Sequence, residues 1–364
     1  MKAKEFTSVV QSLSLGILLA SCSLFSTTLN AEVKAVKLGH SFSDAHPRAI
    51  AMKKFAADVE SATDGEIKIT VYGNAVLGSE QQMLQATRSN VQQLYMGAVS
   101  PLAGFQKQFQ IFDFPFLFSS NEEAAKILDS EFGDKLLTDL NSINLKGLTW
   151  AGGAFRNVAN IKREVTTLEG FKGLKIRVMP TQVAIDSFKS LGITPSPMAY
   201  SEVFTALETG ALDGHEHPSV DILQNKMYEV EKYMTLTGHV YTPVALIVSK
   251  KWFDSLTEKQ KEVIQKVANG NKIFQRQQEI EQEKGAIDEL KKNGMIVSSL
   301  QEGELSKIQQ AVQSVIEKHK KTVGEDTIKH FYDVKKKLAE QYYPDSGKYY
   351  IPAILKKGSH NENS

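Results

Sequence analysis

Arg177 is the side chain whose place in the sequence best suits the binding of an anion. It belongs to the segment Leu174–Val178, in which apolar and basic residues alternate as in a β-strand with one buried face. Thr181 follows as the expected N-cap of a helix. Open α/β sheets bind ligands at the carboxyl ends of their strands, and a guanidinium group matches a carboxylate or a phosphate. Position alone leaves open the alternative that Arg177 is an exposed arginine paired with a nearby carboxylate.

A second set of candidate residues lies in the segment Gly214–Pro218, where His215 and His217 form a His-x-His pattern that metal sites use. Neither a nearby cysteine nor a His-x-x-Glu-His spacing supports a metal, so we expect no metal site. The sequence also has no nucleophile-elbow, phosphate-loop or HExxH motif. We therefore expect no enzyme activity and no cofactor, and a secreted metal-dependent enzyme is the open alternative.

The composition restricts the classes of partner. The chain has 364 residues, with 43 Lys+Arg against 42 Asp+Glu and a formal charge of +1. No basic surplus is available to neutralise phosphates, so nucleic acid is not an expected partner. An apolar content of 41% suits a globular protein, and the length suggests two domains. The aromatic residues of 109–118 are expected to pack in the core, with an exposed docking patch as the alternative.

The N-terminus has the pattern of a targeting segment. Lys2 and Lys4 precede the mostly apolar run Leu13–Ala20, which is too short to span a bilayer. Cleavage after Ala31 is one expectation, and lipid attachment at Cys22 is the alternative. In both cases the protein leaves the cytoplasm.

The segments that must position the candidate residues alternate between strand and helix patterns. A helix is expected after Pro47, and Ser79 with Gln82 forms the capping-box pattern of another. The strands expected from apolar alternation around these helices are 33–39, 67–71 and 91–96. This β-α-β-α-β order predicts a mainly parallel sheet with helices on both faces.

Further elements are expected along the rest of the chain. Asn121 is the expected N-cap of one helix, and Ser201 is that of another. Thr257 with Gln260 predicts a very long helix that ends at Lys292. The remaining expected strands are 145–150, 211–213, 233–238 and 243–249.

Several motifs resemble, by their order and spacing, the substrate-binding proteins of tripartite ATP-independent periplasmic (TRAP) transporters. Each motif is weak alone, and the resemblance rests on the series, which covers residues 33–335. In chain order the motifs read LGHSFSDAHP, VLGSE, SPLAGF, FDFPFLF, GLKIRVMP, TPSPMAYSEVFTALETGALDG and EHP.

The resemblance implies an α/β fold, namely the two-lobed periplasmic binding protein fold with a hinge, mixed sheets and long C-terminal helices. The signal peptide is then expected at 1–31. The first lobe is expected to combine 32–154 with 243–282, and the second to combine 155–242 with 283–340. Residues 341–364 are expected to form a C-terminal tail.

The resemblance also implies a function. It indicates an extracytoplasmic protein that captures a small organic acid anion, such as a C4-dicarboxylate or a sugar acid, and delivers it to TRAP membrane permease subunits. The expected location is the periplasm, the expected state is a monomer, and hinge closure on binding is expected. A ligand-sensing module for a membrane receptor is the alternative, and keto acids or amino acids stay open as ligands.

Particular ligand-binding residues follow from the same resemblance. Family members clamp the carboxylate of an organic acid with the arginine of the KIRV motif, which is Arg177. Arg156 matches a second ligand-side arginine, and Glu80 matches an acidic residue that meets polar groups of the substrate. The other implied ligand-binding residues are Ser41, His46, Tyr200 and His217. The alternatives are a surface position for Arg156, a favourable charge at a helix N-terminus for Glu80 and ordinary packing for Tyr200.

His217 departs from the family pattern, which usually has Gln-Glu-Asn before the proline. Here the histidine takes the place of an asparagine that hydrogen-bonds the ligand. An unperturbed histidine titrates near pH 6.5, so a change of affinity is expected between roughly pH 5.5 and 8 if His217 faces the ligand.

Overall fold

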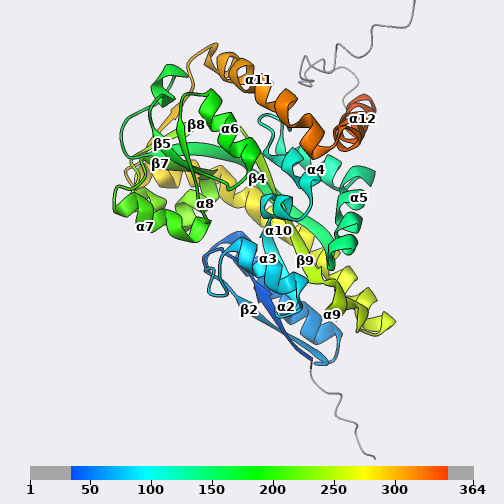
Figure 1. Ribbon diagram of the computed structural model, residues 1–364. Helices are drawn as coiled ribbons and strands as arrows, with labels where there is room; N and C mark the ends of the chain where they lie inside the picture. The colour runs from blue at the N-terminus through cyan, green and yellow to red at the C-terminus, as the bar shows by residue number, and fades with distance from the viewer. Residues whose placement is uncertain (1–33, 343–364) are drawn as a thin grey trace, which may run out of the picture. The chain divides into compact units, whose positions relative to one another are not determined.

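The strands of the protein share one hydrogen-bonded network, which a computed structural model describes within residues 34–342 (Figure 1). The predicted signal segment, Cys22 and nearly all of the predicted tail lie outside the described residues. The strands are β1 Lys34–Gly39, β2 Ile67–Tyr72, β3 Leu94–Ala98, β4 Leu145–Asn160, β5 Lys175–Val178, β6 Thr194–Pro197, β7 Gly214–Pro218, β8 Tyr233–Leu236, β9 Tyr241–Ser249 and β10 Ile296–Ser299.

Helices flank these strands and link them along the chain. The α-helices are α2 Pro47–Ala62, α3 Glu80–Arg88, α4 Asn121–Leu128, α5 Glu131–Asp139, α6 Gln182–Ser190, α7 Val203–Glu208, α8 Ser219–Gln224, α9 Lys250–Asp254, α10 Glu258–Lys292, α11 Glu304–Val323 and α12 Glu325–Tyr342. Short 3-10 segments include η1 Ser100–Gly104, η2 Lys107–Asp113 and η5 Tyr200–Glu202. No helix within residues 34–342 combines the length and apolar content needed to cross a bilayer.

The sheet is mixed, as the implied fold requires, and not mainly parallel as the strand–helix rhythm predicted. Its strand order is β2-β1-β3-β9-β4-β7-β5-β6, and β8 pairs with both β4 and β10. The pairs β1·β3, β5·β6, β5·β7 and β8·β10 are parallel, whereas β9 and β4 run antiparallel to their neighbours. The mainly parallel prediction was wrong because β9 returns antiparallel between β3 and β4.

β4 joins the two groups of strands. Its first part pairs with β9 as far as Phe155, and its last part pairs with β7 from Arg156 onward. The predicted strand 145–150 was therefore too short, since the chain stays extended through Gly152 and Gly153. A Cβ atom on Gly153 would lie 2.6 Å from the carbonyl oxygen of Thr242, so a glycine lets the strands stay close. The lobe boundaries themselves stay a prediction.

Several helix starts follow the predicted capping chemistry. Ser79 and Gln82 form a capping box at α3, with hydrogen bonds of 3.3 and 2.8 Å. Thr257 and Gln260 form another at α10, which ends at Lys292 as predicted. Thr181 caps α6 by accepting from the backbone of Ala184.

Other predicted boundaries were wrong. Ser120, and not Asn121, caps α4, because its side chain accepts from the backbone N–H of Glu123 at 3.1 Å. Ser201 lies within η5, and the helix begins only at Val203. The strand expected at 211–213 lies at Gly214–Pro218 instead, where it pairs with β4. Gly214 allows this pairing, since a Cβ atom there would lie 2.1 Å from the carbonyl oxygen of Ala159.

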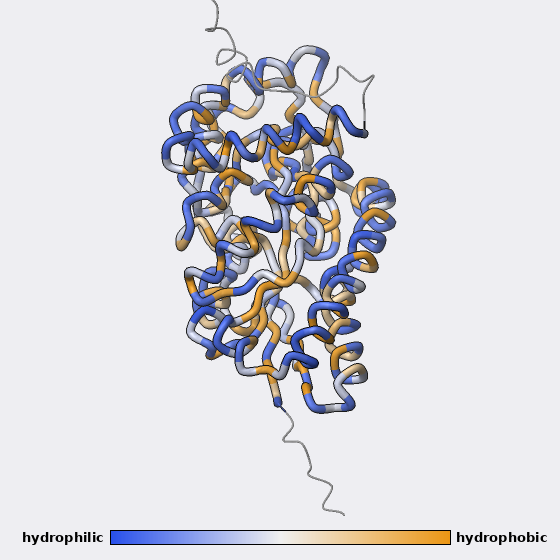
Figure 2. The backbone as a smooth tube through the Cα atoms, turned by 90° about the vertical axis from the view of Figure 1, so that its right-hand side faces the viewer, coloured by the Kyte–Doolittle hydropathy of each residue, from blue (hydrophilic) through white to orange (hydrophobic). Residues whose placement is uncertain are grey.

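The aromatic segment 109–118 packs in the core, as predicted. The ring of Phe112 lies 5.5 Å from that of Trp150, and the ring of Phe118 lies 5.5 Å from that of Phe331. Phe116 is the exception, with a positive φ of 59° and a partly buried side chain. Figure 2 shows hydrophobic residues concentrated on the central strands and interspersed with hydrophilic ones along the helices.

Two helical glycines should respond to alanine in opposite directions. A Cβ atom on Gly133 in α5 would lie 1.8 Å from the carbonyl oxygen of Leu128, whereas one on Gly285 in α10 would meet nothing within 4 Å. Gly285→Ala should raise the free energy of unfolding by about 0.5–1 kcal/mol, because alanine loses less conformational entropy in a helix. Gly133→Ala should lower it by about 1–3 kcal/mol through overpacking. Urea unfolding with equal slopes measures both, and a stabilised Gly133→Ala protein would contradict the close packing of α5 against the end of α4.

Candidate functional site

A cavity lies where β5 and β7 end, opposite the loop after β1 and the start of α3. It is lined by six of the seven predicted ligand-binding residues: Ser41, Glu80, Arg156, Arg177, Tyr200 and His217. The other lining residues are Phe42, Arg48, Ala98, Met179, Pro218, Asp221, Thr242 and Val244. Segments far apart in the sequence thus supply one site.

Arg177 reaches the cavity from the carboxyl end of β5, between Ser196 of β6 and His215 of β7. Its side chain is held by the carbonyl oxygen of Met198, which accepts from Nε at 3.0 Å and Nη2 at 2.8 Å. Among the described residues, Nη1 has no hydrogen-bond partner and no carboxylate pairs with the guanidinium. Burial lowers the pKa of Arg177 to about 10, so the group stays charged at neutral pH.

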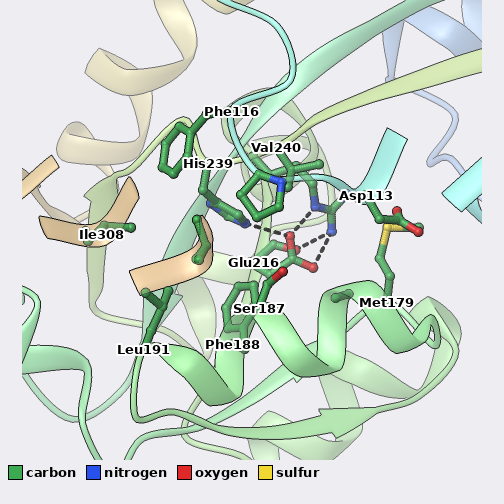
Figure 3. Close-up of a pocket in the computed structure, with 14 residues that line it drawn as sticks. Asp113, Phe116, Met179, Ser187, Phe188, Leu191, Glu216, His239, Val240 and Ile308 are labelled. Atoms are coloured by element: carbon green, nitrogen blue, oxygen red, sulfur yellow. Dashed lines mark hydrogen bonds and ion pairs between the residues drawn. The ribbon is translucent and has the colours of Figure 1, made fainter. Parts of the chain in front are cut away.

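Arg156 is already paired with a carboxylate from the adjacent strand. Its Nε and Nη2 atoms donate to the two carboxylate oxygens of Glu216, the latter at 2.8 Å, and Nη1 donates to the hydroxyl of Thr242 at 3.3 Å. Figure 3 shows the carboxylate of Glu216 beside the ring of His239, whose Nε2 lies 3.4 Å from that carboxylate. Burial opposes ionisation of Glu216, but Arg156 holds the pKa of that carboxyl well below its usual range.

Glu216 was not among the predicted site residues, although its neighbour His217 was. The negative charge of Glu216 favours the charged form of Arg177, whereas the charge of Arg156 opposes that form. The sequence signal that could have found it is its place on β7, one residue before His217 on the opposite face.

Glu80 is the first residue of α3, just after the capping Ser79. The hydroxyl of Ser41 donates to its carboxylate at 3.0 Å, which brings two predicted residues into direct contact. Burial raises the pKa of Glu80 above its usual range, while the Ser41 hydrogen bond and the charge of Arg177 oppose that rise.

His217 lies at the edge of the cavity against Tyr200, and the two ring centroids are 4.4 Å apart. Its Nδ1 atom is 3.6 Å from the carboxylate of Asp221. Burial lowers the pKa of His217 to about 3, despite the opposing effect of Asp221. The predicted titration between pH 5.5 and 8 is therefore not expected for this histidine.

His46 is the predicted residue that the structure places outside this cavity. Its Nδ1 atom accepts from the backbone N–H of Arg48 at 3.1 Å and so caps α2. Its Nε2 atom lies 3.3 Å from Asp221. His46 lines a neighbouring cavity of about 440 Å³, together with Arg48, Asp221 and Glu279. At this position His46 can support the wall of the cavity.

Arg48 and Asp221 were missed by the sequence analysis. Arg48 donates to Glu279 at 2.7 Å and lies 3.5 Å from Asp221, which is itself 1% exposed. The spacing of Asp221 four residues after His217 was the available signal, because that spacing brings side chains together at a helix start. Within residues 34–342, no group of three or more His, Cys, Asp or Glu side chains has the arrangement of a metal site.

The motif order and the fold agree with a known family. The sequence model of the family described as "Bacterial extracellular solute-binding protein, family 7" matches residues 38–322. The chain belongs to this family. Among its relatives, the 2,3-diketo-L-gulonate-binding periplasmic protein YiaO of Escherichia coli K12 is 32% identical, over 79% of this chain and 88% of the relative.

Solved structures of solute-binding proteins share the fold. The sugar acid binding protein DctPAm of Advenella mimigardefordensis, in complex with galactonate, is 35% identical with a TM-score of 0.83, and the match covers 85% of this chain and 99% of that one. A TRAP periplasmic solute-binding protein of Polaromonas sp. JS666, bound to D-erythronate, is 32% identical with a TM-score of 0.79 over 83% and 98% of the two chains. The two-lobed α/β fold of this family is therefore confirmed.

Replacing His217 tests its charge state in this solute-binding protein. A histidine with a pKa near 3 is neutral from pH 5.5 to 8, so His217→Asn should change the affinity for any organic acid anion that the protein binds by the same factor at every pH in that range. Calorimetry should give a ratio of the dissociation constants of His217→Asn and the wild type that stays constant within about twofold, since no titration of His217 contributes. A ratio that changed about tenfold across this range would show that His217 titrates near its usual pKa.

Proposed function

We propose that this solute-binding protein captures a small organic acid anion in the periplasm and delivers it to the membrane permease subunits of a TRAP transporter. The observation that carries the proposal is the guanidinium of Arg177, which is buried, charged and without a carboxylate partner among residues 34–342. A buried charge without a counter-ion is unfavourable, so the cavity favours an anion that supplies one.

The other two arginines of the cavity determine how many ligand carboxylates we propose, because both are already paired. Arg156 is neutralised by Glu216, and Arg48 by Glu279. Among residues 34–342, Arg177 is the one arginine of the cavity without a carboxylate partner, and its Nη1 and Nη2 atoms can offer the planar donor pair that a carboxylate accepts. The proposal is therefore one carboxylate bound at Arg177, with Arg156 holding the geometry behind it.

The relatives support the class of ligand. The proteins from Advenella mimigardefordensis and Polaromonas sp. JS666 bind galactonate and D-erythronate, which are hydroxylated carboxylates. We propose that this protein likewise binds its ligand without transforming it. Cleavage after Ala31 and lipid attachment at Cys22 are both compatible with the periplasmic location, and both positions lie outside the described residues.

Ligand entry requires the lobes to move. The cavity at Arg177 has an accessible volume of about 30 Å³, which admits only a small number of water-sized molecules. A sugar acid with six carbons is much larger, and Arg156 and Arg177 are only 2% and 3% exposed. We propose that the site opens about the hinge to admit the anion and closes over it.

Arg177→Ala tests the proposed carboxylate contact. Loss of one partner of a buried charge pair costs about 2–5 kcal/mol, so galactonate affinity should fall by about 30-fold or more. Arg177→Lys should also lose affinity, because an ammonium group cannot reproduce the planar fork. Lys175→Ala is the matched control, since Lys175 lies on the same strand with an exposed side chain.

Isothermal calorimetry gives the result, with thermal unfolding of each variant as the check on folding. If Arg177→Ala bound the anion with wild-type affinity, Arg177 would not be a ligand-binding residue. A comparable loss in Lys175→Ala would show that the net charge of the protein, and not the Arg177 contact, controls binding.

A further inference from the structure

One part of the cavity wall offers hydrogen-bond acceptors. It is formed by Glu80, Asp221 and His217, which all line the same cavity as Arg177. We infer that the ligand is a monocarboxylate whose chain carries hydroxyl groups, and that this wall excludes dicarboxylates. This inference rests on the proposed function and narrows the class of organic acid.

The cationic side of the cavity can satisfy one carboxylate. Arg156 has both of its carboxylate-facing nitrogens on Glu216, and Arg48 donates to Glu279 at 2.7 Å. Among residues 34–342, Arg177 is the one arginine of the cavity without a carboxylate partner. A second ligand carboxylate would therefore find no free guanidinium group.

Asp221 is the most buried acceptor of the wall, at 1% exposure. Neither of its carboxylate oxygens has a hydrogen bond from a described residue, although Arg48, His46 and His217 lie at 3.3–3.6 Å. Burial opposes its ionisation, but Arg48 outweighs burial and holds the pKa of Asp221 well below its usual range. Asp221 is thus a buried carboxylate that has nitrogen atoms near it but no well-aligned hydrogen bond from a described residue.

His217 contributes a lone pair to the same wall. Its Nδ1 atom faces the carboxylate of Asp221 at 3.6 Å, a position that favours the proton on Nδ1. A neutral imidazole with its proton on Nδ1 has an acceptor at Nε2, and no described residue hydrogen-bonds to that atom. An asparagine at this position would instead offer an N–H₂ donor, so the histidine changes a donor into an acceptor.

Hydroxyl groups on the ligand fit this wall. Each hydroxyl can donate to Glu80, Asp221 or His217 and can also accept. Acceptance matters because the hydroxyl of Tyr200 is buried without a hydrogen-bond partner. An ammonium group only donates and would leave that hydroxyl without an acceptor. A carboxylate only accepts, and placing it against like charges costs several kcal/mol.

The test uses pairs of acids that differ at one terminal carbon. Gluconate and glucarate, galactonate and galactarate, and erythronate and mesotartrate each differ by –CH₂OH against –COO⁻. In the wild-type protein at pH 7.5, calorimetry should show the monoacid of a binding pair to be tighter by about 100-fold or more, given the cost of opposed like charges. A diacid as tight as its monoacid overturns the inference and leaves the proposed function standing.

Glu80→Gln tests whether Glu80 contributes to the preference for the monoacid over the diacid. The amide keeps an oxygen that can accept from Ser41 and removes the charge, so the preference for the monoacid should fall by about tenfold or more. Glu208→Gln is the control, since it removes the same charge from an exposed position at the end of α7. An unchanged preference in Glu80→Gln, in a protein with wild-type melting, would overturn the assignment of Glu80.

Two further outcomes complete the test. Tighter binding of 2-amino-2-deoxygluconate bearing an ammonium group than of gluconate would overturn the choice of hydroxyl donors. Binding of no member of any pair, and of no other organic acid, would overturn the proposed function together with this inference.

Discussion

The ion pair between Arg156 and Glu216 is the interaction on which the site depends. It joins the last part of β4 to β7, where the backbones of Arg156 and Pro218 are paired. Removing either partner would leave an uncompensated buried charge, at a cost of about 3–5 kcal/mol. Because Glu216 occupies Arg156, the positive charge left for a ligand is that of Arg177 alone. The pair therefore links β4 to β7 and, in the function we propose, limits the cavity to one ligand carboxylate.

β7 also positions residues that we propose contact the rest of the ligand. His217 follows Glu216 on β7 and faces Asp221 at the start of α8, while Glu80 approaches from α3 with Ser41. Among residues 34–342, the cavity thus combines one guanidinium that has no carboxylate partner with several hydrogen-bond acceptors.

Much of this arrangement could be predicted from the sequence, because local chemistry determines it. The capping boxes at Ser79 and Thr257, the cap at Thr181 and the strand that ends at Arg177 are set by residues a few positions apart. The family fold and the position of Arg177 followed from motifs in order. Proline, glycine and capping residues give signals within short stretches of sequence, and most predictions made from them were confirmed.

The remaining features depend on contacts between distant segments. Nothing near Arg156 in the sequence indicates that its partner is Glu216, 60 residues away, or that Arg48 pairs with Glu279, 231 residues away. The antiparallel return of β9 gave no local sign and changed the sheet from mainly parallel to mixed. The charge state of His217 likewise depends on its burial against Tyr200 and not on its residue type.

A crystal structure of the protein with a bound monocarboxylate such as gluconate tests the central claim most directly. The account predicts that the ligand carboxylate lies within hydrogen-bond distance of Nη1 of Arg177 while Arg156 keeps its two contacts with Glu216. Ligand hydroxyls should then lie against Glu80, Asp221 and Nε2 of His217. A carboxylate bound by Arg156, with Glu216 displaced from that guanidinium, would contradict the account.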